Sequence, residues 1–239
     1  MGIHTADAII LRRYLFRETS VIVSCLTARY GKIKGLVKGL RVHPNRHRSA
    51  MEVLTVNRIV FYDTHTSQIH LISQCELTKP LEALQRNLDL MRAASLCIEL
   101  ADAVTPLEEP QPAVYQLLLE TLERLAGGGE IDATRLHFIV RLLRLAGFQP
   151  QLDVCTGCSG PVHAAGYWSA KQGGLLCQQC LHEDPKAEPA LADSLEALDA
   201  LSHNEQPIAL EAPLLRLLKQ RIDQFLKWRL EHPLKTLTV

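Results

Sequence analysis

The sequence lacks a long hydrophobic run, a net charge and any segment that reads as a targeting signal. Its 239 residues hold 26 Lys and Arg against 26 Asp and Glu. No apolar run approaches the roughly 18–20 residues that span a bilayer. The first residues lack the apolar stretch of a secretion signal, and Ala6 breaks the myristoylation motif. We therefore expect a cytoplasmic protein that does not enter a membrane.

Motifs for nucleotide and hydrolytic chemistry are also missing. The sequence contains no G-x-x-x-x-G-K-[ST], G-x-G-x-x-G, G-x-S-x-G or H-E-x-x-H pattern. Acidic residues are scarce in the first 72 residues, where only four occur, which argues against a carboxylate cluster for Mg²⁺-dependent chemistry. We therefore predict that the protein is not an enzyme.

The neutral total hides an uneven distribution of charge. Residues 1–72 hold eleven Lys and Arg against four acids, a net charge of +7, and the remainder carries −7. The densest segment, Gly31–Ser49, has six basic residues and no acid. Like charges this close repel one another unless a partner neutralises them. The first part of the chain is therefore predicted to bind a polyanion.

The same first part has the pattern of a small β-barrel. Five short segments rich in β-branched residues are separated by turn-like stretches, at 6–14, 19–27, 32–39, 53–62 and 67–74. Lys32–Lys38 alternates, with Ile33, Gly35 and Val37 on one face and three lysines on the other, which we expect to be exposed. Five strands in about 75 residues predict an OB-fold, a common nucleic-acid-binding barrel.

The rest of the chain is mostly helical by its apolar periodicity. Helices are expected at 81–104, 113–126, 133–147, 191–203 and 212–232, with Asp132 as an N-cap and Gly147 as the residue that ends its helix. We predict an α+β, multidomain protein. It would consist of an OB-fold DNA-binding domain at 1–79, a helical domain formed by 80–150 and 190–239, and a zinc-binding insert at 151–189.

Four of the seven cysteines have metal-ligand spacing. Cys155-x2-Cys158 and Cys177-x2-Cys180 match a four-cysteine zinc ribbon, in which each CxxC turn supplies two thiolates. The segment between them resembles a short hairpin with Gly173-Gly174 at its turn. The other three cysteines lie singly in apolar segments, as buried free cysteines do. We predict one structural Zn²⁺ per chain.

A catalytic or redox use of these cysteines is the alternative. His163 and His182 lie nearby and compete as ligands, and a catalytic zinc keeps one position open. A deaminase-like site needs H-x-E before P-C-x-x-C, and no Pro precedes either pair here. The structural reading is therefore favoured.

The order of these parts resembles the RecO family of bacterial recombination mediators, over essentially the whole chain. The most specific matches are LAGFQPQLDVCTGC at 145–158 and HPLKT at 232–236, and ADAIILRRYLFRETSVIV at 6–23 also fits. Some members have lost cysteines, whereas this sequence keeps all four.

The resemblance implies a DNA repair and homologous recombination function without catalysis. Members resembling this chain have an N-terminal OB-fold, a helical domain and, in many, a zinc ribbon. They bind single- and double-stranded DNA, anneal complementary strands and, with RecR, help to load RecA onto DNA coated by single-strand-binding protein. By resemblance, the partners are DNA, RecR, the C-terminal tail of single-strand-binding protein and, indirectly, RecA, and the location is cytoplasmic and nucleoid-associated.

Basic side chains are the candidate DNA contacts, because Lys and Arg neutralise phosphates without reading sequence. The main candidates are Lys32, Lys34, Lys38, Arg41, Arg46 and Arg48, followed by Arg12, Arg13 and Arg17. Four aromatic residues are candidates for base stacking or, alternatively, for barrel packing: Tyr14, Phe16, Tyr30 and Tyr62.

Two other functions remain open from the sequence. One is a zinc-braced helical adaptor that binds an acidic protein rather than DNA, and the other is a zinc enzyme acting on nucleic acid. A helix carrying Arg135, Arg141 and Arg144 offers a positive rim for the acidic tail of single-strand-binding protein, although a charged, solvated helix face has the same pattern.

Overall fold

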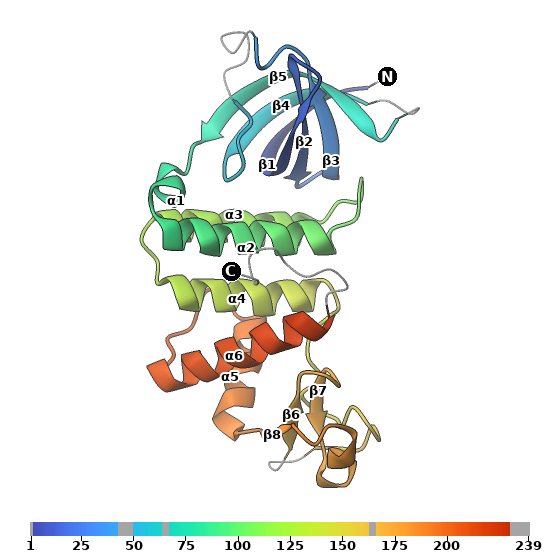
Figure 1. The fold of residues 1–239 in the computed structure, drawn as a ribbon, viewed down its shortest axis with the longest axis vertical. Coiled ribbons are helices and arrows are strands. Elements are labelled where there is room, and N and C mark those ends of the chain that lie inside the picture. The colour runs from blue at the N-terminus through green and yellow to red at the C-terminus, as the bar shows by residue number, and fades with distance from the viewer. Residues whose placement is uncertain (1, 43–49, 64–66, 163–165, 230–239) are drawn as a thin grey trace. The chain divides into compact units, whose positions relative to one another are not determined.

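The computed structural model describes residues 2–42, 50–63, 67–162 and 166–229 (Figure 1). Contacts divide the chain into two compact units, Met1–Ile131 and Asp132–Val239, and each is described by itself. The division into an OB-fold, a helical domain and a zinc insert stays a prediction.

The first unit contains a closed five-stranded barrel. Its strands are β1 (Ile3–Phe16), β2 (Ser20–Thr27), β3 (Gly31–Val37), β4 (Val56–Tyr62) and β5 (Ile69–Lys79), as Figure 1 shows. They close in the order β1-β2-β3-β5-β4, with β3 parallel to β5 and every other neighbouring pair antiparallel. This OB-like barrel confirms the fold predicted from the five alternating segments.

Alternation along β3 decides which side chains fill the barrel. Ile33, Gly35 and Val37 are buried, whereas Lys32, Lys34 and Leu36 between them are partly exposed. A Cβ on Gly35 would lie 2.3 Å from Cδ1 of Ile72, so the barrel interior has no room for a side chain there. The period of two was therefore sufficient to assign the two faces of this strand.

Three helices complete the first unit: α1 (Glu82–Arg86), α2 (Leu88–Val104) and α3 (Pro112–Ala126). The prediction of one continuous helix at 81–104 is wrong, because Asn87 adopts an extended conformation between α1 and α2. Its side-chain oxygen accepts hydrogen bonds from the backbone N–H groups of Asp89, at 2.9 Å, and Leu90, at 3.1 Å. Asparagine is a strong N-cap, and this preference overrides the helical periodicity across it.

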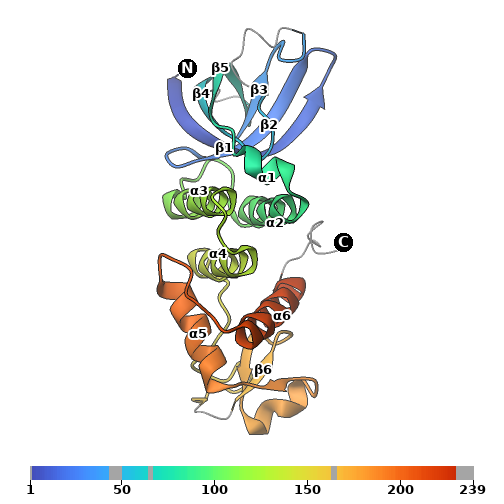
Figure 2. The same ribbon diagram turned by 90° about the vertical axis from the view of Figure 1, so that its left-hand side faces the viewer.

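The second unit contains α4 (Ile131–Leu145), α5 (Ala192–His203) and α6 (Ala212–Arg229), which Figure 2 shows from the side. Asp132 lies in the first turn of α4 rather than at its N-cap. Gly147, with φ of +74°, ends α4 as predicted: its N–H bonds to the Arg144 carbonyl and the Phe148 N–H to that of Leu143.

A small three-stranded sheet lies between α4 and α5 in the sequence. Strands β6 (Tyr167–Ser169) and β7 (Gly174–Leu176) form the predicted hairpin, and β8 (Glu188–Pro189) pairs with the other edge of β6. A short 3₁₀ helix, η2 (Gln178–Glu183), carries the last of the four clustered cysteines. Across the described ranges, no helix has both the length and the apolar character needed to cross a membrane.

Replacing Asn87 with Ala tests the helix boundary. We expect Asn87→Ala to lower the free energy of unfolding by about 1 kcal/mol, because two N–H groups of α2 lose their acceptor. Chemical denaturation measures this change. Gln85→Ala, at an exposed position of α1, is the control and should shift stability by less than about 0.5 kcal/mol. Equal stability of the Asn87 variant and wild type would contradict the capping role.

Candidate nucleic-acid interface and metal site

The strand register places basic and apolar side chains in rows on the outer face of the barrel. Arg12, Ser24 and Lys34 lie side by side across β1, β2 and β3. Two residues along each strand, Tyr14, Ile22 and Leu36 form the next row. Residues that pair across neighbouring strands share one face, so the six side chains point away from the barrel interior.

Helix α2 contacts the Arg12 end of this face through Asp102. Its carboxylate pairs with the Arg12 guanidinium and, at 3.1 Å, with Lys32 Nζ. Lys32 Nζ also donates to the Asp102 carbonyl oxygen at 2.6 Å. Burial lowers the pKa of Arg12, but the Asp102 charge and hydrogen bonds to Tyr14 and Asp102 raise it above its usual value.

The environment of Lys32 differs from the sequence expectation of an exposed lysine. Its side chain is only 13 % exposed beside α2, and Asp102 of that helix neutralises its charge. Period-two alternation distinguishes inside from outside but carries no information about which outer residues a helix later covers. Asp102 itself gave no sequence signal, because an acidic residue on an amphipathic helix is usually solvated.

Beyond these contacts the outer face is open. Tyr14 is 50 % exposed, Lys34 is partly exposed, and Lys38 and Arg41 are exposed after the end of β3. The β1–β2 turn lies beside them: the Arg41 N–H bonds to the Thr19 carbonyl at 3.1 Å. We call Tyr14, Lys34, Lys38, Arg41 and the turn residue Arg17 the open basic face.

Arg17 and Arg41 belong to the same corner of the barrel. Arg41 Nη1 donates to the Arg17 carbonyl oxygen at 3.3 Å, and the Arg17 guanidinium lies 5.2 Å from the centre of the Phe16 ring. Both side chains are exposed. Arg13 differs from them, because it pairs with Glu52 at 3.6 Å and is 24 % exposed.

The remaining candidates for DNA contact are two arginines after β3 and two tyrosines predicted to stack on bases or pack in the barrel. Arg46 and Arg48 lie outside the described residues. Tyr30 packs edge-on against Phe61 at 5.2 Å between ring centres, as part of the barrel interior. Tyr62 is partly exposed at the end of β4, so Tyr14 is the most exposed tyrosine of the four aromatic candidates.

The four spaced cysteines come together in the second unit. The sulfur atoms of Cys155, Cys158, Cys177 and Cys180 all lie within 4.8 Å of one another, and the Cys158 and Cys177 sulfurs are 3.8 Å apart. Tetrahedral zinc thiolate bonds of about 2.3 Å place sulfurs about 3.8 Å apart. The cluster therefore fits a closed, structural zinc site with four sulfur ligands.

Backbone N–H groups stabilise the thiolate form of Cys155. The Cys177 N–H donates to Cys155 Sγ at 3.3 Å. Burial raises the pKa of Cys155, but hydrogen bonds from backbone groups of Cys177, Cys158 and Gly157, and from the Cys158 side chain, lower it to about 6. A thiolate is the form that binds zinc, so this arrangement favours the ligand state.

The two CxxC turns approach each other closely at Gly157. A Cβ there would lie 2.5 Å from Glu183 Oε1 and 3.1 Å from the Cys180 Cβ, so glycine lets the turns meet. His182 is exposed, its Nδ1 lies 2.8 Å from the Gln179 carbonyl oxygen, and it is not part of the sulfur cluster. His163, the other candidate ligand, lies outside the described residues.

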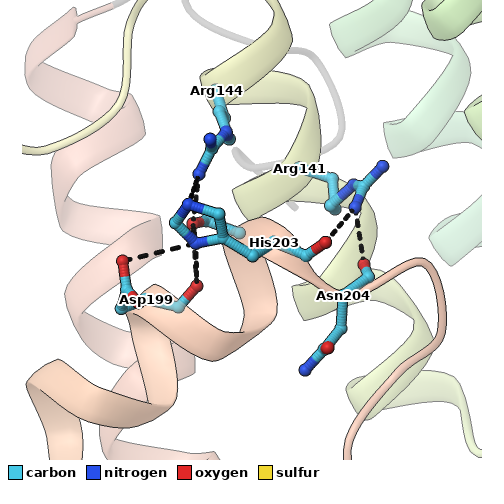
Figure 3. Close-up of polar contacts among 6 residues, drawn as sticks. Arg141, Arg144, Asp199, His203 and Asn204 are labelled. Atoms are coloured by element: carbon cyan, nitrogen blue, oxygen red, sulfur yellow. Dashed lines mark hydrogen bonds and ion pairs between the residues drawn. The ribbon is translucent and has the colours of Figure 1, made fainter.

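The arginines of α4 brace the second unit internally. Arg141 donates to the carbonyl oxygens of His203, at 2.9 Å, and Asn204, at 2.7 Å, while Arg144 contacts the His203 ring (Figure 3). Arg135 pairs with Asp223 of α6 at 3.1 Å. Arg144 also lines a cavity of about 540 Å³ together with Leu195, Leu198 and Ile222.

Comparison with known proteins identifies the family. The model "Recombination protein O N terminal" matches residues 1–81, and "Recombination protein O C terminal" matches residues 85–238. The chain belongs to the RecO family. This confirms the resemblance and assigns the chain to DNA repair and recombination.

Individual RecO proteins match over most of the chain. "DNA repair protein RecO" of Pelotomaculum thermopropionicum is 29% identical over 99% of this chain and 93% of its own length. The RecO protein of Desulforudis audaxviator is 30% identical, over 92% of this chain and 84% of its own length. That of Symbiobacterium thermophilum is 32% identical over 84% of this chain and 79% of its own length.

Removing the charge of Asp102 tests how α2 is held on the barrel. We expect Asp102→Asn to destabilise the protein by about 1–3 kcal/mol, because the sheltered Lys32 ammonium loses its counter-charge. Chemical denaturation measures the change in stability. Asp7→Asn is the control, since Asp7 pairs with Arg58 where both side chains are well exposed, and should destabilise the protein less. Equal destabilisation by the two substitutions would contradict the special role of Asp102.

Removing one clustered cysteine tests the metal site. We expect wild-type protein to contain one zinc per chain and Cys158→Ala to lose it, because three sulfurs close the site poorly. Cys97→Ala is the control, since Cys97 is buried in α2 outside the cluster, and should keep the metal. Elemental analysis measures the zinc content of each protein. Wild-type protein that purifies without metal and has the same melting temperature with and without a chelator would overturn the zinc site.

Proposed function

We propose that this protein binds single- and double-stranded DNA without reading sequence and anneals complementary strands. The observation that supports this most strongly is the open basic face, which combines Lys34, Lys38, Arg41 and Arg17 with an exposed Tyr14. Cations neutralise phosphates, and the exposed ring offers a stacking surface to unpaired bases. Neutralisation on one face lowers the repulsion between two strands, which is the physical requirement of annealing.

The two cations that pair with Asp102 take a different part in this proposal. Lys32 and Arg12 are engaged with Asp102 and therefore support the face from beside it, and they contribute less to DNA binding than Lys34, Lys38 and Arg41. The four cysteines hold a structural zinc that orders the β6–β8 region. No chemical step is proposed, and the protein acts by binding.

Membership of the RecO family supports the protein partners that we propose. With RecR, the protein helps to load RecA onto DNA coated by single-strand-binding protein, in the cytoplasm and at the nucleoid. Contact with the acidic C-terminal tail of single-strand-binding protein is part of the proposal, and no surface is assigned to it. Arg135, Arg141 and Arg144 all bond within the unit, and three acids, Asp153, Glu196 and Asp199, line the 540 Å³ cavity beside Arg144.

Reversing charge on the open basic face tests the proposal. We expect Lys34→Glu/Lys38→Glu/Arg41→Glu to abolish retention of single-stranded DNA in a gel-shift assay and to slow annealing. Removing each cation that binds a phosphate should reduce the slope of log K against log salt by about one. The salt series therefore distinguishes weaker phosphate neutralisation from a general change in affinity.

A matched variant controls for net charge. Arg86→Glu/Arg92→Glu/Arg216→Glu reverses three exposed helix arginines and changes the net charge by the same amount. It should bind and anneal DNA like wild type. Normal binding by the barrel variant would overturn the assignment of this face, and absence of DNA binding by wild type would favour a protein-interaction adaptor instead.

A further inference from the structure

Both tryptophans of the chain line one cavity in the second unit. The sequence contains two, Trp168 on β6 and Trp228 near the end of α6. The cavity measures about 670 Å³, and Lys171, Lys186 and Pro185 also contribute to its lining. Its lining shares no residue with the open basic face or with the cysteine cluster, so the functions proposed for those two sites do not account for the cavity.

The two indoles have different exposures. Trp168 is 2 % exposed and packs against Phe225 at 6.2 Å between ring centres, so it forms a fixed wall. Its indole nitrogen is buried and has no hydrogen-bond partner among the described residues. Trp228 is 61 % exposed, which leaves most of a large aromatic surface facing solvent at the edge of the cavity.

Two lysines and two acids line the cavity, and the lysines are the groups able to contact a phosphate. Lys171 and Lys186 are exposed, and no described carboxylate forms an ion pair with either side chain. Of the two acids in the lining, Asp184 is engaged, because it accepts hydrogen bonds from Ser169 Oγ at 2.5 Å and the Lys186 N–H at 3.2 Å.

The second acid, Glu188, faces a buried cation. Burial lowers the pKa of the Arg221 guanidinium, and the nearby charge of Glu188 opposes that shift. Arg221 itself is anchored by Ser194 Oγ and the Pro189 carbonyl oxygen, both at 2.8 Å. The two exposed lysines line the same cavity as the exposed indole.

We propose that this cavity is a second contact for single-stranded DNA, in which an unpaired base stacks on Trp228. Lys171 and Lys186 then contact the neighbouring phosphates as point charges. Stacking on an aromatic ring tolerates any base, in keeping with binding that does not read sequence. This inference rests on the proposed DNA-binding function and adds a strand contact in the second unit, selective for unpaired over paired DNA because duplex bases are already stacked.

Because both tryptophans line the cavity, the intrinsic tryptophan fluorescence of the chain reports binding there. Titration of the full-length wild-type chain with oligo(dT) should quench its intrinsic fluorescence, because the exposed indole lies at the proposed site. Duplex DNA at the same concentration should quench it much less. The barrel variant Lys34→Glu/Lys38→Glu/Arg41→Glu should still show quenching, at higher oligo(dT) concentration.

Affinity for a fluorescently labelled oligo(dT) then tests the role of the ring. Trp228→Ala should weaken binding about five-fold or more, because one stacked base contributes roughly 1–3 kcal/mol. Trp228→Phe keeps an aromatic ring and should bind within about two-fold of wild type. Leu191→Ala, which removes an apolar side chain of similar exposure in the same unit, should have no effect.

The outcomes separate this inference from the proposed function. If wild type binds no DNA, both fail. If wild type binds DNA and the barrel variant loses that binding, while Trp228→Ala binds like wild type and oligo(dT) leaves the fluorescence unchanged, only the second contact is overturned. That result would also be obtained if the cavity accepted a protein segment instead of DNA.

Discussion

The first unit depends on one carboxylate that satisfies two cations. Asp102 lies on α2 and reaches Arg12 on β1 and Lys32 on β3, so a single side chain joins the helix to two strands of the barrel. Without it, the largely buried Lys32 ammonium would lose its counter-charge where water screens it poorly, with the more exposed Arg12 guanidinium nearby. The pairing therefore lets a strongly basic barrel carry a helical layer on its outer face.

The same pairing divides the basic residues into two groups. Arg12 and Lys32 pair with Asp102, whereas the side chains of Lys38 and Arg41 are exposed and that of Lys34 is partly exposed. Charge density in the sequence identified the segment, but covering by α2 decides which of its cations are available. The open basic face is therefore smaller than the cluster of positive charge in the sequence.

Short sequence patterns predicted the strands and the cysteine cluster well, because both depend on residues that are close together in the chain. Segments rich in β-branched residues between turn-like stretches predicted all five barrel strands. The spacing of the cysteines predicted the cluster, since each CxxC turn brings its own two sulfurs together. The helix break at Asn87 was missed because the apolar periodicity continues across it. Covering of Lys32 and the shared cavity of Trp168 and Trp228 arise from contacts between residues far apart in the chain, which no short pattern records.

The region around the cysteines has an unusually small apolar interior. Its buried cluster consists of Cys155, Leu176 and Cys180, so two of its three members are metal-ligand candidates. A zinc ion held by the four cysteines would add a cross-link to this small interior. With such an ion the stability of the region would follow mass action: where the folded site is saturated and the unfolded chain binds little metal, each tenfold change in free metal alters it by about 1.4 kcal/mol. The chain would thus join a unit that folds around a packed barrel to a region whose stability depends on the supply of an inorganic ligand.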